Sequence, residues 1–290
     1  MLENVRNLVS HDNGNTWKTI QGCLRELGYR TTKEPQILSP HFYGIPQIRE
    51  RVIILGKYDP ENIDVPLDID LGEKTGLNMN SIYTVLDEGE VEPEYHISGY
   101  EERVLEAWDE FYHGIGLRAI GFPIWADYFK YTGSYKGMPG WKVDFIQKNK
   151  KLYEDNREFI DGWLERHNNL QDFVPTHHKM EWQCGTEISS IWEGVIQFRP
   201  SGIRVKSPET FQALVAMVQI PVIGRYRRRM TVREAARLQS FPVDDEEYPF
   251  LPDANKQQAF KQFGNSVNVE VIRRATKALL ECDGETEKES

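Results

Sequence analysis

The spacing of hydrophobic and polar residues predicts an α/β segment at the start of the chain. Apolar side chains recur at helical spacing over residues 16–27, and Gly28 ends that stretch. A short strand is expected at residues 36–38. The run at residues 51–56 is apolar on both faces, as a strand in the middle of a sheet should be. A helix followed by buried strands indicates a layered α/β unit.

The pattern changes after a stretch rich in Pro, Asp and Glu at residues 59–80, which we interpret as a linker. Ser98 and Glu101 have the spacing of a capping box before an amphipathic helix. One long helix is predicted at residues 143–167, with aromatic side chains at heptad-like intervals. These aromatic side chains are expected to pack a local core, and stacking on nucleic-acid bases is the alternative.

Helical patterns return near the carboxyl end. Thr231 and Glu234 have the spacing of a second capping box. Asp253 is predicted to cap a helix that Gly264 ends, and an amphipathic helix is expected at residues 267–280. The tail that follows is polar.

Composition narrows the class of protein. The chain has 290 residues, of which 39% are hydrophobic, and seven are Trp, which is typical of a packed globular protein of one or two domains. No apolar run approaches the roughly 20 residues that a membrane span needs. The three cysteines show neither paired nor metal-ligand spacing. We therefore expect a cytoplasmic protein without a bound metal.

Charge is unevenly distributed along the chain, whose net charge is −10. Residues 59–110 contain sixteen acidic and two basic side chains, whereas residues 196–240 contain nine basic and two acidic ones. This polarity suits a protein with one face toward a polyanion and another away from it, although two unrelated solvated surfaces would look the same. The strongest candidates for phosphate contact are Arg225, Arg227, Arg228 and Arg229, which could instead join domains.

Four motifs resemble, in order, those of the cytosine-5 DNA methyltransferases. They are a Glu-Asn-Val motif at residues 3–5, a Gln-x-Arg-x-Arg motif at 47–51, an Arg-rich motif at 229–242 and a Gly-Asn-Ser-Val motif at 264–267. The resemblance implies the second half of a Rossmann-like methyltransferase domain that uses S-adenosylmethionine. It assigns residues 1–76 and 223–290 to the catalytic domain, and residues 77–222 to an inserted target-recognition domain that reads bases in the major groove.

The resemblance also assigns chemistry to individual residues. Methylation of carbon 5 of cytosine requires a nucleophile to add at carbon 6, which needs the developing negative charge on the ring to be neutralised. Glu3 would donate a proton or a strong hydrogen bond to ring nitrogen 3, and Arg51 would bind the cytosine carbonyl oxygen. Arg49 would hold the pocket or a phosphate, and Asn4 would organise the local backbone.

The Gly-Asn-Ser-Val motif is the candidate cofactor-binding segment. Gly264 is expected to end one helix, with Asn265 and Ser266 at the start of the next. Backbone N–H groups at a helix start suit a carboxylate. By resemblance, Asn265, Ser266 and Val267 help to line the site for S-adenosylmethionine. The alternative is that they are only cap and core residues.

Two motifs of the family are absent from these residues. There is no Phe-x-Gly-x-Gly loop for the cofactor, and no Cys follows a Pro. Gly114 and Gly116 have no preceding strand, and the residues around Cys184 do not resemble a nucleophile loop. We therefore expect the second subunit of a split bacterial restriction-modification enzyme, used at the nucleoid, whose partner polypeptide supplies both motifs.

Three alternatives to the split DNA methyltransferase remain open at this point. The chain could be a fragment of a truncated gene. It could be a non-catalytic module that binds DNA alone with a steep salt dependence. It could also act on cytosine in RNA, although the large inserted region favours DNA.

Overall fold

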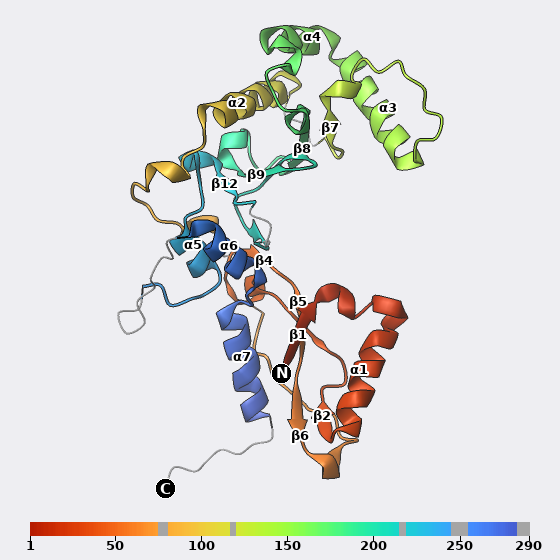
Figure 1. Cartoon of the computed structure of the whole chain (residues 1–290), viewed down its shortest axis with the longest axis vertical. Helices are drawn as coiled ribbons and strands as arrows, with labels where there is room; N and C mark the ends of the chain where they lie inside the picture. Colours follow the sequence, from red (N-terminus) through yellow and green to blue (C-terminus); the bar gives the residue numbers. More distant parts are fainter. Residues whose placement is uncertain (75–80, 117–119, 215–218, 245–254, 283–290) are drawn as a thin grey trace. The chain divides into compact units, whose positions relative to one another are not determined.

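The computed structural model describes residues 1–74, 81–116, 120–214, 219–244 and 255–282. The chain forms two compact units, and each of them is assembled from segments that are distant in sequence. The first unit contains Met1–Leu86, Glu209–Ala216 and Val232–Ser290, and the second contains Asp87–Pro208 and Met217–Thr231. The first unit thus brings together the two ends of the colour scale in Figure 1.

A three-stranded antiparallel sheet is the centre of the first unit. Its order is β1 (Leu2–Val5), β5 (Arg51–Ile54), β3 (Gln36–Leu38), and β5 pairs with both neighbours. The expected strand at residues 36–38 is confirmed. Strand β5 covers the first four residues of the predicted run, and a separate short strand, β6 (Gly56–Tyr58), pairs with β2 (Tyr29–Thr31).

Helices cover both faces of this sheet, which explains the apolar run of β5. Val52 and Ile54 cluster with Trp17 of α1 (Asn15–Glu26) on one face. Ile53 points the other way and clusters with side chains of α7 (Val269–Glu281). Figure 1 shows α1 and α7 on opposite sides of β1 and β5. The expectation of a layered α/β unit is confirmed.

The later segments of the first unit return to its amino-terminal part. Strand β11 (Phe211–Gln212) pairs in parallel with β4 (Gln47–Ile48). Two short helices, α5 (Val232–Leu238) and α6 (Lys256–Asn265), follow before α7. The Gln-x-Arg-x-Arg motif therefore lies where the amino-terminal and carboxyl-terminal segments of this unit meet.

The second unit has a six-stranded mixed sheet. Its order is β13-β12-β9-β10-β8-β7, and all neighbours are antiparallel except β10 and β8. The strands are β7 (Ile124–Trp125), β8 (Lys179–Gln183), β9 (Val195–Arg199), β10 (Gly202–Lys206), β12 (Val222–Ile223) and β13 (Arg228–Arg229).

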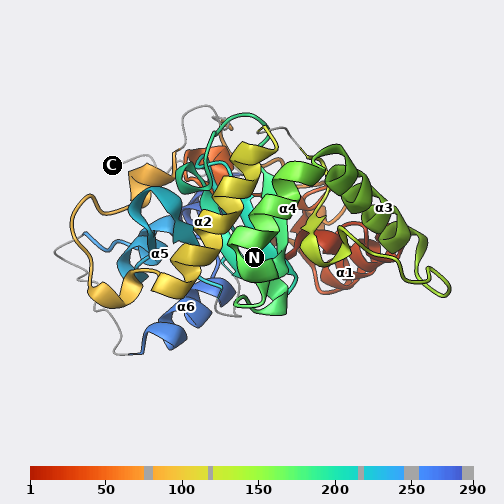
Figure 2. The ribbon, with the colours of Figure 1, turned by 90° about the horizontal axis from the view of Figure 1, so that it is seen from above.

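Aromatic side chains form the core of the second unit. Trp108 and Phe111 of α2 (Gly99–Gly114) and Trp163 of α4 (Arg157–Arg166) are fully buried, and the ring centroids of Phe111 and Trp163 are 4.9 Å apart. Figure 2 shows α2 and α4 running side by side. A third helix, α3 (Gly140–Asp155), precedes α4. Phe159 and Trp163 pack in this cluster, as the expectation of a local core requires.

The capping box of α2 is confirmed, but the single helix at residues 143–167 is wrong. The Ser98 side chain accepts from the Glu101 N–H, and Glu101 accepts in return from the Ser98 N–H. The long helical pattern is broken at Asn156, whose φ of −131° and ψ of 30° are not helical. The Asn156 side-chain amide donates to the Leu152 carbonyl oxygen, a local bond that competes with continuation of the helix.

The amphipathic helix expected near the carboxyl end is confirmed, with its start slightly later than expected. Helix α7 begins at Val269, and the Asn268 side chain caps it by accepting from the Val271 N–H. Asp253 lies outside the described residues, and Asn255 caps α6 by accepting from the Gln258 N–H. Helix α5 begins directly after Thr231.

Two structural features are absent from the described part of the chain. None of its helices combines the length and the apolar character that crossing a membrane requires. Its His, Cys, Asp and Glu side chains form no group of three or more that could hold a metal ion.

Candidate active site

Glu3 and Arg51 face each other across neighbouring strands. In the β1–β5 register, Val5 lies opposite Arg51 and Glu3 lies opposite Ile53, so both side chains project from the same face of the sheet. The Arg51 Nε is 2.9 Å from the Glu3 Oε1. The two side chains are 19% and 31% exposed, which leaves the pair accessible to a ligand while fixing its geometry.

The backbone around this pair is held by short-range bonds. The Asn4 Oδ1 accepts from the Val5 N–H at 2.8 Å, which confirms the expectation that Asn4 organises the local backbone. The Arg51 Nη1 donates to the Glu50 carbonyl oxygen at 2.9 Å, while the Glu50 carboxylate pairs with Arg6. Glu50 and Arg6 thus form a second ion pair next to the pair of Glu3 and Arg51.

Arg49 is buried and binds the backbone of two distant segments. Only 4% of this residue is exposed. Its guanidinium donates to the carbonyl oxygens of Leu214 at 3.0 Å, Gly264 at 2.8 Å and Ser266 at 2.7 Å. Burial, assisted by the charge of Arg51, lowers the pKa of Arg49 to about 10, so it remains a cation at neutral pH. This geometry favours a role in which Arg49 holds the pocket together over one in which it contacts a phosphate.

The Gly-Asn-Ser-Val motif lies beside this guanidinium, but it is not a helix start. Asn265 is the last residue of α6, and the Ser266 N–H bonds to the Gln262 carbonyl oxygen at 2.8 Å. Asn265 and Ser266 therefore do not stand at a helix start, and the expectation of free N–H groups there is wrong. Asn265 is exposed, and Ser266 and Val267 are half-buried. Their role in cofactor binding stays a prediction that depends on the resemblance.

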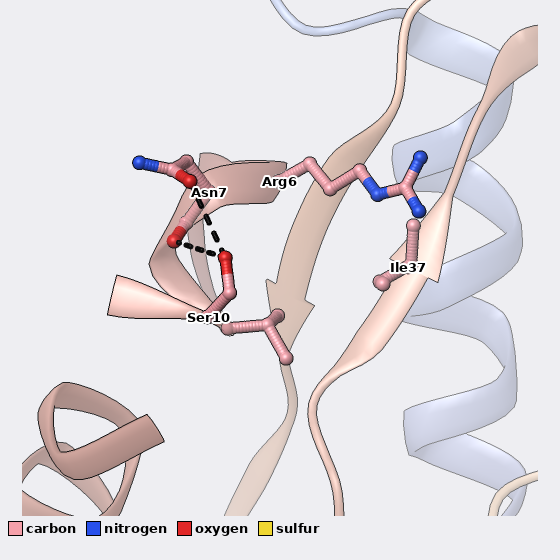
Figure 3. Close-up of a pocket in the computed structure, with 5 residues that line it drawn as sticks. Arg6, Asn7, Ser10 and Ile37 are labelled. Carbon is pink, nitrogen blue, oxygen red and sulfur yellow. Dashed lines mark hydrogen bonds between the residues drawn. The ribbon is translucent and has the colours of Figure 1, made fainter. Parts of the chain in front are cut away.

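A cavity opens directly after strand β1. Its volume is about 460 Å³, and it is lined by Arg6, Asn7, Val9, Ser10 and Ile37. Figure 3 labels Arg6, Asn7, Ser10 and Ile37. The Ser10 hydroxyl donates to the Asn7 carbonyl oxygen at 3.4 Å and fixes the turn. The cavity was not predictable from the sequence, because its lining residues come from a turn and from β3 and share no spacing.

The four arginines predicted to bind DNA all lie in the second unit. Arg227 pairs with Glu102 and Glu106, and Arg229 pairs with Glu101. Arg228 is only 3% exposed and donates to the carbonyl oxygens of Arg229 and Asp87. Arg225 is exposed. Three of the four side chains thus stabilise the fold of this unit, and their contact with phosphate stays a prediction.

Cys184 is part of the core of the second unit. It is 2% exposed, and burial raises the pKa of its thiol to about 12. A thiol must ionise to act as a nucleophile. The rejection of Cys184 as the catalytic cysteine is therefore supported by its environment.

This burial predicts unequal thiol reactivity. At pH 8 in the folded protein, we expect Cys184 to react with a thiol reagent at least about 10³-fold more slowly than the exposed Cys23, because its thiolate forms only as the pH rises toward 12. Peptide mass spectrometry after timed alkylation measures both rates, and urea should equalise them. Equal alkylation rates of Cys184 and Cys23 in the folded protein would contradict the burial of Cys184.

The fold and the site together define a class of protein. Residues 1–281 match the family model described as C-5 cytosine-specific DNA methylase, so the chain belongs to this family. Membership supports a methyltransferase function that uses S-adenosylmethionine.

Relatives of the chain include several Type II methyltransferases. The chain is 29% identical to the Type II methyltransferase M.AluI of Cellulosimicrobium cellulans, with 98% of this chain and 71% of that protein aligned. It is 28% identical to M.BanI of Aneurinibacillus aneurinilyticus, over 97% of this chain and 70% of that protein. For M.HpaII of Haemophilus parainfluenzae the identity is 29%, and the chain spans 59% of its length. Among solved structures, S. pombe Dnmt2 methyltransferase has a TM-score of 0.45 and 16% identity, with 96% of this chain and 66% of that one covered.

Proposed function

We propose that this chain is a subunit of a DNA cytosine-5 methyltransferase. It supplies the Glu and Arg of the base pocket together with the unit that recognises the target. The observation that supports the proposal most directly is the ion pair between Glu3 and Arg51 on one face of β1 and β5. The target cytosine must leave the duplex to reach such a pair, because the faces of its ring are otherwise stacked.

Each side chain of the pair has a defined task on a flipped cytosine. As a nucleophile adds to carbon 6, negative charge develops on the ring. Glu3, once its carboxyl group is protonated, donates a hydrogen bond or that proton to ring nitrogen 3, and Arg51 binds the carbonyl oxygen. The bond from Arg51 to the backbone of Glu50 holds its guanidinium beside Glu3 before the base arrives.

The cofactor is assigned to the segment at residues 264–267. S-adenosylmethionine supplies the methyl group when it is bound. The exposed Asn265 and the half-buried Ser266 and Val267 would hold part of it. Arg49 fixes the backbone of this segment through the Gly264 and Ser266 carbonyl oxygens. The residues present form only part of a site, so we propose that it is shared with a second polypeptide.

The nucleophile is also assigned to that second polypeptide. None of the three cysteines follows a proline, and Cys184 is buried and protonated. The proposed partner contains the Pro-Cys and Phe-x-Gly-x-Gly motifs. The active enzyme is then a heterodimer bound to double-stranded DNA.

Reconstitution tests this proposal. We expect the purified 290-residue chain to transfer no labelled methyl group to duplex DNA, and co-purification with a polypeptide bearing both motifs to restore transfer. A partner with its motif Cys changed to Ser is the matched control and should restore nothing. Activity of the single chain would overturn the split arrangement. DNA binding without transfer in every combination would favour the non-catalytic module, and transfer to RNA alone would favour an RNA enzyme.

A further inference from the structure

Over β8, β9 and β10, one face of the sheet in the second unit is mostly polar, although the opposite face is packed. Side chains alternate along β8, β9 and β10, and Met180, Ile203 and Val205 project into the aromatic core. The other face presents the cations Lys179, Arg199, Arg204 and Lys206, the amides Gln183 and Gln197, and the carboxylate Glu181. We call this surface the cationic sheet face.

The strand register places these charges next to one another. Arg204 lies between Glu181 on β8 and Gln197 on β9, and Lys206 lies beside Gln183. The Arg204 Nε and Nη2 are 2.9 and 2.7 Å from the Glu181 Oε2. The Arg199 Nη1 is 3.7 Å from the same oxygen. In these three strands one carboxylate therefore serves two guanidinium groups.

The excess of positive charge is electrostatically unfavourable in the free protein. Arg199 and Arg204 are 27% and 20% exposed, so water screens them only in part. Burial and the charge of Arg204 lower the pKa of both Arg199 and Lys206. Like charges on neighbouring strands destabilise a sheet, whereas a bound polyanion would compensate them.

An aromatic cluster borders this face at β7. Trp125 lies opposite Lys179 in the register, and the Lys179 Nζ is 5.9 Å from the centroid of its ring. The neighbouring ring of Trp141, whose centroid is 6.4 Å from that of Trp125, is 60% exposed. Cations beside aromatic rings are a common composition of nucleic-acid-binding surfaces.

The arginines chosen from the sequence are less suitable for this task. Arg227 and Arg229 are compensated by Glu102 and Glu101 of α2, and Arg228 is buried. We propose that the cationic sheet face, rather than Arg227, Arg228 and Arg229, makes the main phosphate contacts of this unit with duplex DNA. The inference rests on the proposed function, because it identifies where the DNA of that reaction is held. Phosphate contacts position a protein on the duplex, and Gln183 and Gln197 are amides of the kind that can bond base edges.

Salt-dependent binding tests the inference. The chain in complex with its complementing polypeptide is titrated with a fluorescent 30-base-pair duplex at several NaCl concentrations. In the double variant Arg199→Gln/Arg204→Gln we expect Kd to rise about 10-fold or more, and the slope of log Kd against log salt to fall by about 2. Lys151→Gln, on α3 and paired with Asp155, is the matched control and should bind as the wild type does.

A second variant separates binding from folding. Glu181→Gln removes the carboxylate that Arg199 and Arg204 share, so we expect DNA to bind several-fold more tightly. A side chain with only a structural role would not give tighter binding. Weaker binding in this variant, or wild-type affinity and slope in the double variant, would overturn the inference.

The outcomes also separate this inference from the proposed function. If the wild-type complex methylates DNA and only Arg227→Gln/Arg229→Gln weakens binding, the sheet face is wrong and the proposed function stands. If the wild-type complex does not bind duplex DNA at all, or binds acidic peptides instead, both proposals fail.

Discussion

Replacing Glu3 by Gln in the reconstituted enzyme is expected to lower the rate of methyl transfer by about 10²- to 10⁴-fold, the usual contribution of a positioned general acid. Gln has the same size and can still donate an N–H bond, but it cannot deliver a proton to ring nitrogen 3. It also removes the negative charge that holds Arg51 at 2.9 Å. The loss should therefore appear mainly in kcat, measured by single-turnover transfer of labelled methyl groups.

Glu26→Gln is the control for this experiment. Glu26 is an exposed residue at the end of α1, outside the site, and its replacement should leave the rate unchanged. DNA affinity should also be similar in both variants, because Glu3 is proposed to act on the flipped base and not on phosphate. Glu3→Gln with wild-type kcat would remove Glu3 from the mechanism.

The local features of the fold were predictable from sequence. The capping box at Ser98 and Glu101 is specified by residues close in sequence. The apolar run of β5 is specified by burial on both faces of its sheet. The split between α3 and α4 was not predictable from periodicity, because one Asn side-chain bond interrupts an otherwise continuous pattern.

The site itself depends on contacts that no local pattern encodes. Glu3 and Arg51 meet because β1 and β5 are antiparallel in one particular register. The carbonyl oxygens that Arg49 binds are 165 to 217 residues away in sequence. Motif resemblance could bring these residues to attention, but it could not assign their hydrogen-bond partners.

Charge distribution along the sequence was a poor guide to charge distribution in space. Glu101, Glu102 and Glu106 belong to the acidic stretch, yet they pair with Arg227 and Arg229 of the basic stretch. The two stretches therefore neutralise each other in part within the second unit. The cations of the cationic sheet face lie on alternate residues of β8, β9 and β10. A charge count over a sequence window includes residues from both faces of a strand, so it does not reveal this surface.

Replacing Arg49 by Ala is expected to destabilise the first unit by about 3–5 kcal/mol. The change leaves three carbonyl oxygens without their charged donor, and each buried polar group that loses its partner costs roughly 1–3 kcal/mol. Some of that cost is offset by water entering the space. Urea unfolding monitored by hydrogen exchange in β5 and at the α6–α7 junction measures the effect on this unit separately from the other.

Arg49→Lys distinguishes charge from geometry in this prediction. Lys keeps the positive charge, but its single ammonium group cannot reproduce the planar fork that reaches both Leu214 and the 264–266 segment. We expect an intermediate loss of stability. Arg25→Ala, which removes an exposed ion pair with Asp64, should cost no more than about 1 kcal/mol. If Arg49→Ala were as mild as Arg25→Ala, Arg49 would not be the residue that holds the Gly-Asn-Ser-Val segment in place.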